Sequence, residues 1–130
     1  MKLVYFGLAV FFTLVAQAQV VNFPDAKFKA KLLQASTSAF IAFDADNNAI
    51  AIDVNGNGEI ETTEALAVYY LTVQGNQFDP ANMISDLTGI SAFTNLRYLS
   101  CQTNLLTSLD LTALANLETI ICSNNNINPL

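Results

Sequence analysis

The sequence predicts an α/β solenoid, short and built on parallel strands, that follows a small N-terminal cap containing a helix and a hairpin. Two observations predict this organisation. Apolar residues and asparagines recur with a period of 21 residues toward the end of the chain, and an apolar run typical of an export signal opens it. We therefore divide the 130 residues into a signal peptide (1–18), an N-terminal cap (19–67) and repeats (68–130).

The amino-terminal segment has the layout of a secretory signal peptide. Lys2 supplies a positive charge, residues 3–15 are apolar, and Ala16 and Ala18 form a small-x-small cleavage site. The apolar run is short for a membrane span, so we expect cleavage after Ala18, a secreted or cell-surface protein, and no membrane insertion after cleavage. A buried N-terminal helix or an uncleaved anchor is the alternative.

Composition excludes most kinds of catalytic site. Residues 19–130 keep four basic residues against eleven acidic ones, a net charge of −7, which disfavours nucleic acid as a partner and suits a divalent cation. The chain has no His and a single Arg, so His-based triads, His-ligated zinc and arginine clamps on phosphate are nearly all excluded. A carboxylate-based hydrolase is a weak hypothesis, because the acids cluster in one turn or stand singly. We expect no enzymatic activity.

Three elements are expected in the cap. The segment "NFPDAKFKAKLLQA" (22–35) predicts a helix, with Asp25 near its start and Phe28 and Leu32 on one face. The alternation of Phe28 and Leu32 with lysines would also fit a strand, but Ala, Lys and Leu favour a helix. Residues 41–43 and 50–52 predict two short strands joined by the turn "DADNNA".

The repeats emerge from three segments that can be laid over one another: "VYYLTVQGN" (68–76), "LRYLSCQTN" (96–104) and "LETIICSNN" (117–125). Each has apolar residues at positions 1, 4 and 6 and Asn at position 9, which is the leucine-rich-repeat pattern. One coil cannot bury its own apolar face, so equivalent residues should stack from coil to coil. The first repeat carries a loop excursion, "QFDPAN" (77–82), and the chain stops halfway through a repeat, so we expect a truncated solenoid.

Two inward repeat positions carry specific expectations. Asn76, Asn104 and Asn125 should form a stacked row in which each amide satisfies backbone groups that no strand reaches. Cys101 and Cys122 share one position on adjacent strands. Side-by-side thiols in the core are favoured over a disulfide there, because side chains in a parallel ladder point in the same direction.

Alternate positions of the repeat strands should face outward and form a ligand-binding face. These positions are Tyr70, Thr72, Gln74, Tyr98, Ser100, Gln102, Thr119, Ile121 and Ser123. Tyrosines among them are suited to anchor a protein ligand. The alternative for each residue is an ordinary solvated strand position, because three strands make a small face.

The stretch "IDVNGNGEIETTEAL" (52–66) matches the calcium-loop pattern D-x-[DN]-x-[DN]-G-x5-E at every position. Side-chain oxygens alternate along it, Gly58 permits the sharp turn, and the last glutamate closes the shell from a helix that starts at residues 62–63. The expected calcium ligands are Asp53, Asn55, Asn57, the carbonyl of Glu59, Glu61 and Glu64. With few carboxylates we expect weak binding, about 10⁻⁴–10⁻³ M, by a structural ion. The alternative is a Gly-rich turn with solvated acids, because a strand rather than a helix precedes the loop.

The chain resembles secreted leucine-rich-repeat proteins of Bacteroidetes-type bacteria, broadly internalin-like, with an EF-hand- or dockerin-like calcium loop in the N-terminal cap. The resemblance lies in the motifs and in their order, and is carried by residues 22–33, 52–66, 84–111 and 117–127. The resemblance implies repeats that present a protein-binding face. From it we expect a secreted, non-enzymatic module for protein recognition or adhesion. The alternative is a calcium-stabilised cap or spacer of a longer secreted protein whose activity lies in a C-terminal region.

Overall fold

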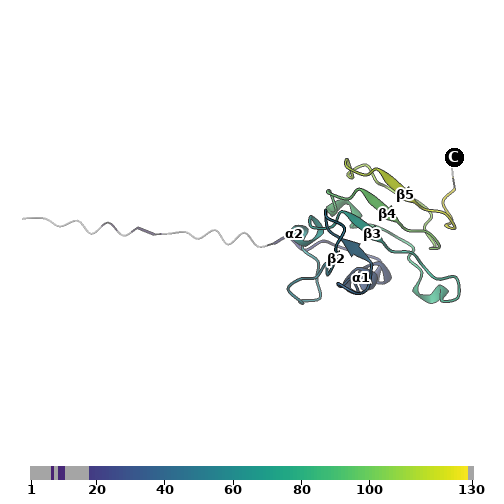
Figure 1. Ribbon diagram of the computed structural model, residues 1–130, viewed down its shortest axis with the longest axis horizontal. Coiled ribbons are helices and arrows are strands. Elements are labelled where there is room, and N and C mark those ends of the chain that lie inside the picture. The colour runs from purple at the N-terminus through teal and green to yellow at the C-terminus, as the bar shows by residue number, and fades with distance from the viewer. Residues whose placement is uncertain (1–6, 8, 11–17, 129–130) are drawn as a thin grey trace, which may run out of the picture.

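A computed structural model of the chain describes residues 7, 9, 10 and 18–128 (Figure 1). The expected signal peptide, residues 1–18, lies almost wholly outside the described residues, so it stays a prediction. No helix within the described residues has both the length and the apolar character needed to cross a membrane.

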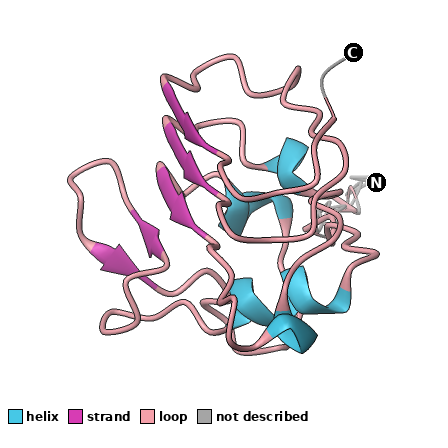
Figure 2. Cartoon of the chain, turned by 90° about the vertical axis from the view of Figure 1, so that its right-hand side faces the viewer, coloured by secondary structure: helices cyan, strands magenta, loops and turns pink. Residues whose placement is uncertain are grey.

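One five-stranded sheet organises the structure, with the strand order β2-β1-β3-β4-β5. The strands are β1 (Ala42–Phe43), β2 (Ala49–Ile50), β3 (Tyr70–Thr72), β4 (Tyr98–Ser100) and β5 (Thr119–Ile121). The helices are α1 (Ala26–Leu33) and α2 (Thr62–Ala65), with 3-10 turns η1 (Pro80–Asn82) and η2 (Ile90–Ala92). Figure 2 shows the strands along one side of the molecule and the helical turns on the other, with the core between them.

The sheet is mixed, so the prediction of a sheet of parallel strands was wrong for the sheet as a whole. Strands β3, β4 and β5 are parallel, and Tyr70 pairs with Tyr98, which pairs with Thr119. This register is the one given by overlaying the three repeat segments. The cap hairpin adds β1, which runs antiparallel to both β2 and β3. A turn as short as residues 44–48 can join only antiparallel strands, because a parallel connection needs a long crossover.

Helix α1 is present but starts later than the expected residue 22. Asp25 is its N-cap, and one carboxylate oxygen accepts hydrogen bonds from the backbone N–H groups of Lys27 (2.8 Å) and Phe28 (3.2 Å). Phe28 and Leu32 are buried, which confirms the helical spacing of the apolar face. The ring of Phe23 packs edge-on against Phe28 at 5.4 Å between centroids.

Asp25 also ties the cap to the repeats. Its second oxygen accepts hydrogen bonds from the N–H groups of Ser85 (2.8 Å) and Asp86 (3.0 Å), about sixty residues away in the chain. Partial burial raises the pKa of Asp25. The backbone hydrogen bonds, that of Ser85 first, lower the pKa by more than burial raises it, so the pKa lies below its usual value. The ionised carboxylate is therefore the form that the folded chain stabilises.

We expect Asp25→Ala to lower the free energy of unfolding by about 2 kcal/mol at neutral pH, because it removes a helix cap and a cap-to-repeat contact together. Urea denaturation measures this loss. Since the folded pKa is lowered, the difference from the parent should be complete above about pH 4 and should disappear as the pH falls through the folded pKa. Asp46→Ala is the control, because the Asp46 carboxylate accepts no hydrogen bond from the described residues. An equal loss in both variants would contradict the assignment.

The asparagine row forms at two of its three expected positions. The Asn104 amide donates to the carbonyl oxygens of Val73 and Cys101, and Asn125 donates to those of Cys101 and Cys122. The expectation was wrong for Asn76, which is exposed and accepts a hydrogen bond from Phe78 N–H within the excursion loop. The strand beside β3 on the cap side is antiparallel, so it presents no equivalent carbonyl groups to Asn76.

A second asparagine row, which the sequence reading missed, lies before the strands. Asn95 donates to the Leu66 carbonyl oxygen (2.8 Å) and Asn116 to that of Thr94 (3.0 Å). Asn95 and Asn116 are 21 residues apart, as are Asn104 and Asn125 in the expected row. The coils that contain β4 and β5 are thus each joined to the preceding coil by a side-chain amide on both sides of the strand.

Cys101 and Cys122 are both free thiols. Burial, and then the charge of Cys122, raises the pKa of Cys101 to about 11. Cys101 is therefore protonated at neutral pH and packs as a small apolar side chain, because only the thiolate is a good nucleophile or metal ligand.

Candidate functional site

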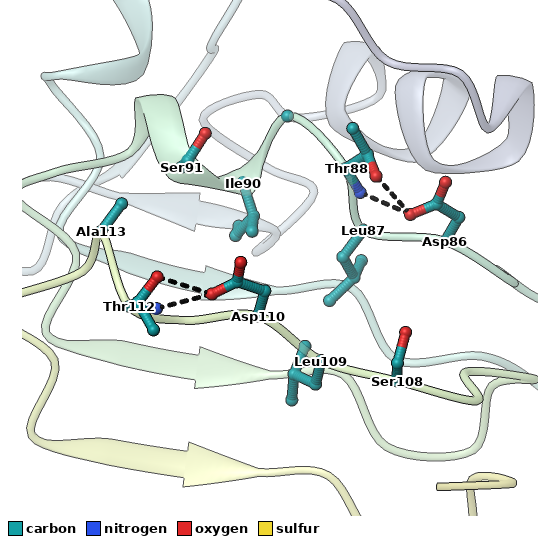
Figure 3. A pocket seen from close by; sticks show the side chains of 11 residues that line it. Asp86, Leu87, Thr88, Ile90, Ser91, Ser108, Leu109, Asp110, Thr112 and Ala113 are labelled. Carbon is teal, nitrogen blue, oxygen red and sulfur yellow. Dashed lines mark hydrogen bonds between the residues drawn. The ribbon is translucent and has the colours of Figure 1, made fainter.

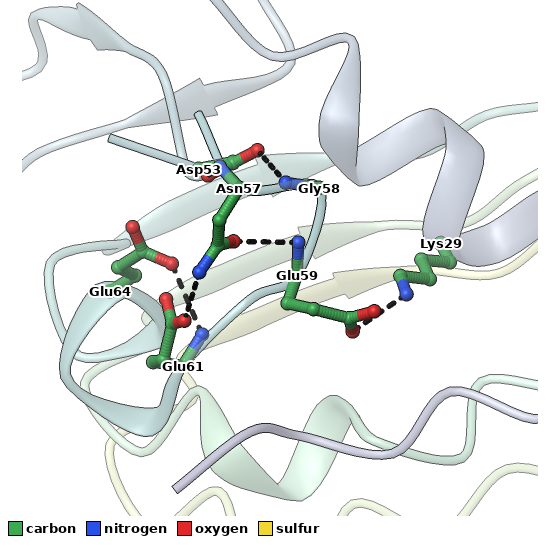
Figure 4. A network of polar contacts seen from close by, with 7 residues as sticks. All are labelled: Lys29, Asp53, Asn57, Gly58, Glu59, Glu61 and Glu64. Atoms are coloured by element: carbon green, nitrogen blue, oxygen red, sulfur yellow. Dashed lines mark hydrogen bonds and ion pairs between the residues drawn. The ribbon is translucent and has the colours of Figure 1, made fainter. Parts of the chain in front are cut away.

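The loop after β2 is wrapped around the carboxylate of Asp53 (Figure 4). One Asp53 oxygen accepts hydrogen bonds from Gly56 N–H (2.9 Å) and Asn57 N–H (3.2 Å), and the other from Gly58 N–H (2.9 Å). Gly56 and Gly58 have φ values of 70° and 78°. Glycine adopts such positive values without strain, because it has no Cβ atom to clash with the backbone. The first expected ligand residue therefore also sets the path of the backbone.

Glu64 closes the loop from α2. Its Oε1 accepts a hydrogen bond from Val54 N–H (2.8 Å) and its Oε2 one from Glu61 N–H (3.1 Å). Glu61 and Glu64 thereby form a capping box at the start of α2, which begins at Thr62 as expected. The last acidic residue of the pattern holds both ends of the loop together.

The side chains of Asn55 and Asn57 both point at Glu61. Their amide nitrogens lie 3.3 Å and 2.6 Å from the Glu61 carboxylate oxygens. A hydrogen bond with the Glu64 side chain, and then the one from Asn57, lowers the pKa of Glu61 below its usual value. Two amide donors thus occupy the acceptor oxygens that a cation would otherwise contact.

These residues suit a hard cation in donor type. Asp53, Glu61 and Glu64 carry carboxylates, and half a turn of the Asn55 and Asn57 amides would present oxygen in place of nitrogen. Across the described residues, however, no three acidic or cysteine side chains are grouped closely enough to hold a metal ion. A bound ion would therefore rely on amide and backbone oxygens and on rotation of the two amides, and calcium binding stays a prediction.

The loop is fixed to its surroundings at three points. The ammonium group of Lys29 on α1 lies 2.7 Å from a carboxylate oxygen of Glu59, so that side chain points away from the loop interior. Val21 N–H donates to the Ile60 carbonyl oxygen (2.8 Å), and Thr62 N–H to that of Gln19 (2.8 Å). The first residues after the expected signal peptide therefore pair with the end of the loop.

The second candidate site is the outward face of β3, β4 and β5. Tyr70 and Tyr98 are half-buried neighbours on adjacent strands, with Thr119 exposed beside them. Gln102 donates to Gln74 (2.8 Å) and lies 3.4 Å from the Ser123 hydroxyl, so one row is internally hydrogen-bonded.

Ser100 is only 3% exposed, so its expected place among accessible contact residues was wrong. It is small and lies on the central strand of the three, where Thr72 and Ile121 flank it. The remaining outward positions are exposed or half-buried. Every one of the nine expected positions is uncharged, although the chain around them is strongly acidic.

The cap hairpin extends this face with aromatic residues that the sequence reading missed. Phe43 pairs with Tyr70 across β1 and β3, and neighbours in a register share a side of the sheet. Phe40 is 68% exposed, and its ring centroid lies 6.3 Å from that of Phe43. Only the antiparallel register, which hydrophobic periodicity does not reveal, brings these rings beside the repeat tyrosines.

A hollow of about 210 Å³ lies between two turns with the same sequence, Asp-Leu-Thr (Figure 3). Asp86 accepts hydrogen bonds from the N–H and hydroxyl groups of Thr88, and Asp110 from those of Thr112. The Thr112 hydroxyl, followed by its N–H, lowers the pKa of Asp110. Both carboxylates therefore act as acceptors within their own turns.

No family model matches the chain, and no curated protein does. Among solved structures the chain resembles an internalin (inlF) of Listeria monocytogenes, with a TM-score of 0.56 and 23% identity over 91% of the chain. It also resembles the structure of the CBM51-2 and INT domains of Clostridium perfringens ZmpB, with a TM-score of 0.54 and 22% identity over 79% of the chain. The chain covers 29% of the first structure and 17% of the second. At such identities the likeness is one of fold, and the fold is internalin-like.

Proposed function

We propose that this chain is a secreted, non-enzymatic leucine-rich-repeat module that recognises or adheres to a protein ligand through the outward face of β3, β4 and β5. One observation carries the proposal: an uncharged face with two adjacent tyrosines lies on an acidic molecule. Interface centres are depleted of charge and enriched in tyrosine, so this face has the composition of a binding surface. The likeness to an internalin fold supports the repeat architecture.

Capture from solubilised cell-surface proteins tests the binding face. The full chain is immobilised and compared with the double variant Tyr70→Ala, Tyr98→Ala, after circular dichroism has shown that both are folded. We expect the double variant to lose at least about 90% of the captured protein, because central aromatic anchors dominate interface energy. Tyr69→Ala is the matched control, since the Tyr69 ring instead lies 5.3 Å from the Arg97 guanidinium carbon. Undiminished capture by the double variant would overturn the proposal.

We further propose that the loop of residues 53–64 binds calcium and that the ion stabilises the cap. Asp53, Asn55, Asn57, Glu61 and Glu64 would supply side-chain oxygens, and Glu59 its backbone carbonyl. The loop already carries the backbone hydrogen bonds that its turn requires, so little chain would need to move. The role is structural, because Lys29 and residues 19–21 hold the loop against the cap.

Calcium should raise the melting temperature of the parent chain by about 5 °C when its concentration is ten times the dissociation constant. The physical reason is that the ion binds only the folded loop. Thermal melts with calcium chloride and with a chelator measure the shift. Glu64→Gln should abolish it, while Asp46→Asn, in the neighbouring polar turn, should retain it. If the parent chain melts at the same temperature in millimolar calcium and in chelator, the calcium proposal is wrong.

A cap or spacer of a longer secreted protein is the second candidate function. Ile120 on β5 is 37% exposed, whereas Leu71 and Leu99 at the equivalent positions of β3 and β4 are fully buried. The edge of β5 would therefore suit a further segment of protein packed upon it. Sequencing of the coding region beyond residue 130 discriminates the two: further repeats favour recognition, and an enzymatic or sorting domain favours the spacer.

A further inference from the structure

The loop excursion of residues 77–82 lines a cleft that also includes Gln74, at the end of the outward sheet face. Residues of α1 and residues 74–76, which follow β3, also line this cleft, whose volume is about 450 Å³. Pockets for small molecules have volumes of about 300–1,000 Å³. The lining includes the polar residues Lys27, Lys31, Gln74, Asn76, Asp79 and Asn82.

Two ammonium groups give the cleft a local positive charge. Lys27 and Lys31 are four residues apart on α1, so they lie on the same side of the helix. They are two of the four basic residues in residues 19–130. Lys29, on another side of the same helix, instead pairs with Glu59 and does not line the cleft. With Asp79 as the third charged residue of the lining, the cleft has a net charge of +1 (2 − 1) on an acidic chain.

The excursion loop is held in shape by its own polar groups. Asn76 Oδ1 accepts a hydrogen bond from Phe78 N–H (2.9 Å), and Asp79 accepts one from the Asn82 amide (2.8 Å). Pro80 starts the short η1 turn between them. The cleft therefore exists before a ligand arrives, which reduces the entropy lost on binding.

We propose that this cleft binds a small polyhydroxylated carboxylate, the chemical class of sugar acids. The carboxylate would lie against the ammonium groups of Lys27 and Lys31. Hydroxyl groups would donate to Asp79 and exchange hydrogen bonds with the amides of Gln74, Asn76 and Asn82. This activity goes beyond the proposed recognition face, with which the cleft shares only Gln74.

Titration of the ¹⁵N-labelled full chain with D-glucuronate, followed by amide NMR shifts, tests the inference. We expect saturable shifts confined to α1, the end of β3 and the excursion loop, with a dissociation constant of about 1 mM. The double variant Lys27→Gln, Lys31→Gln should bind at least about tenfold more weakly. Lys29→Gln is the matched control and should bind like the parent, and added salt should weaken binding because the lysines are accessible to solvent.

Glucose and acetate separate the two parts of the recognition. Glucose lacks the charge and acetate lacks the hydroxyl groups, so each should bind at least about tenfold more weakly than glucuronate. If glucose bound as tightly as glucuronate, the lysines would not contribute to recognition. If acetate bound as tightly, the amides would not contribute. Either result overturns the proposal. The absence of saturable shifts with glucuronate in the parent, or an equal loss in Lys29→Gln, would also overturn it.

Discussion

Replacing Asn104 with alanine should lower the free energy of unfolding by about 3 kcal/mol, because this buried amide joins its own coil to the preceding one. Its Oδ1 accepts a hydrogen bond from Ile84 N–H (2.9 Å), and its Nδ2 donates to the carbonyl oxygens of Val73 (2.9 Å) and Cys101 (3.0 Å). The side chain is only 2% exposed, so water cannot replace it without opening the coil. Alanine removes the partners of the Ile84 N–H and of the Val73 carbonyl oxygen, whereas the Cys101 carbonyl oxygen still accepts from Asn125. Each buried group left without a partner is costly.

Asn76→Ala provides the matched control, because Asn76 has the same repeat position but is exposed. Its loss should be within about 0.5 kcal/mol, as is usual for surface substitutions. Guanidinium denaturation of both variants measures the difference. Comparable losses in the two variants would show that the stacked amide does not stabilise the junction between the coils.

Gly75→Ala is expected to cost about 3 kcal/mol or to prevent folding, because the added methyl group has no space. A Cβ at residue 75 would lie 1.9 Å from the Thr103 carbonyl oxygen and 2.7 Å from Asn104 Oδ1. The nearest obstacle is backbone, which cannot rotate away. Gly75 N–H also donates to the Gln102 carbonyl oxygen (3.0 Å), so the two coils touch through their main chains at this point.

Gly56→Ala separates this clash from the general cost of replacing glycine. Gly56 has a φ of 70° but open space around its Cα, so alanine there suffers only the conformational penalty of about 1 kcal/mol. Thermal melts of both variants decide the matter. If Gly75→Ala were no less stable than Gly56→Ala, the close approach of the coils at residue 75 would be refuted.

The repeat strands could be predicted from sequence because stacking imposes the same apolar pattern on each coil. The 28-residue and 21-residue offsets of Tyr70, Tyr98 and Thr119 in the sequence are the pairings found in the sheet. Asn104 and Asn125 also take the predicted place. The physical reason is local repetition: each coil meets a neighbour of similar sequence, so one pattern describes every contact.

The cap could not be read in the same way, because its neighbours differ from it. The antiparallel pairing of β1 with β3 depends on long-range register and leaves no trace in periodicity. This pairing also leaves Asn76 without the expected carbonyl partners and brings Phe43 beside Tyr70. Burial of Ser100 follows from its small size between two flanking strands, which alternation alone does not show.

The loop of residues 53–64 was predicted as a motif, and its turn is present because the motif dictates its own backbone. Asp53 and the glycines form the turn through local hydrogen bonds, and Glu64 follows in α2. The direction of the Asn55 and Asn57 amides toward Glu61 was not foreseen. The orientation of an amide depends on whether its neighbour is a carboxylate or a cation, and the sequence does not specify which of the two each amide faces.

Hydroxyl-radical footprinting of the full chain, with and without a captured protein ligand, tests whether the outward sheet face is the binding surface. We predict that oxidation of Tyr70 and Tyr98 falls at least about fivefold in the complex, because interface anchors lose contact with water. Phe78, which is 86% exposed on the excursion loop, should stay as reactive as in the free chain. Unchanged oxidation of the two tyrosines together with protection of Phe78 would place the ligand on another surface and contradict the proposed binding face.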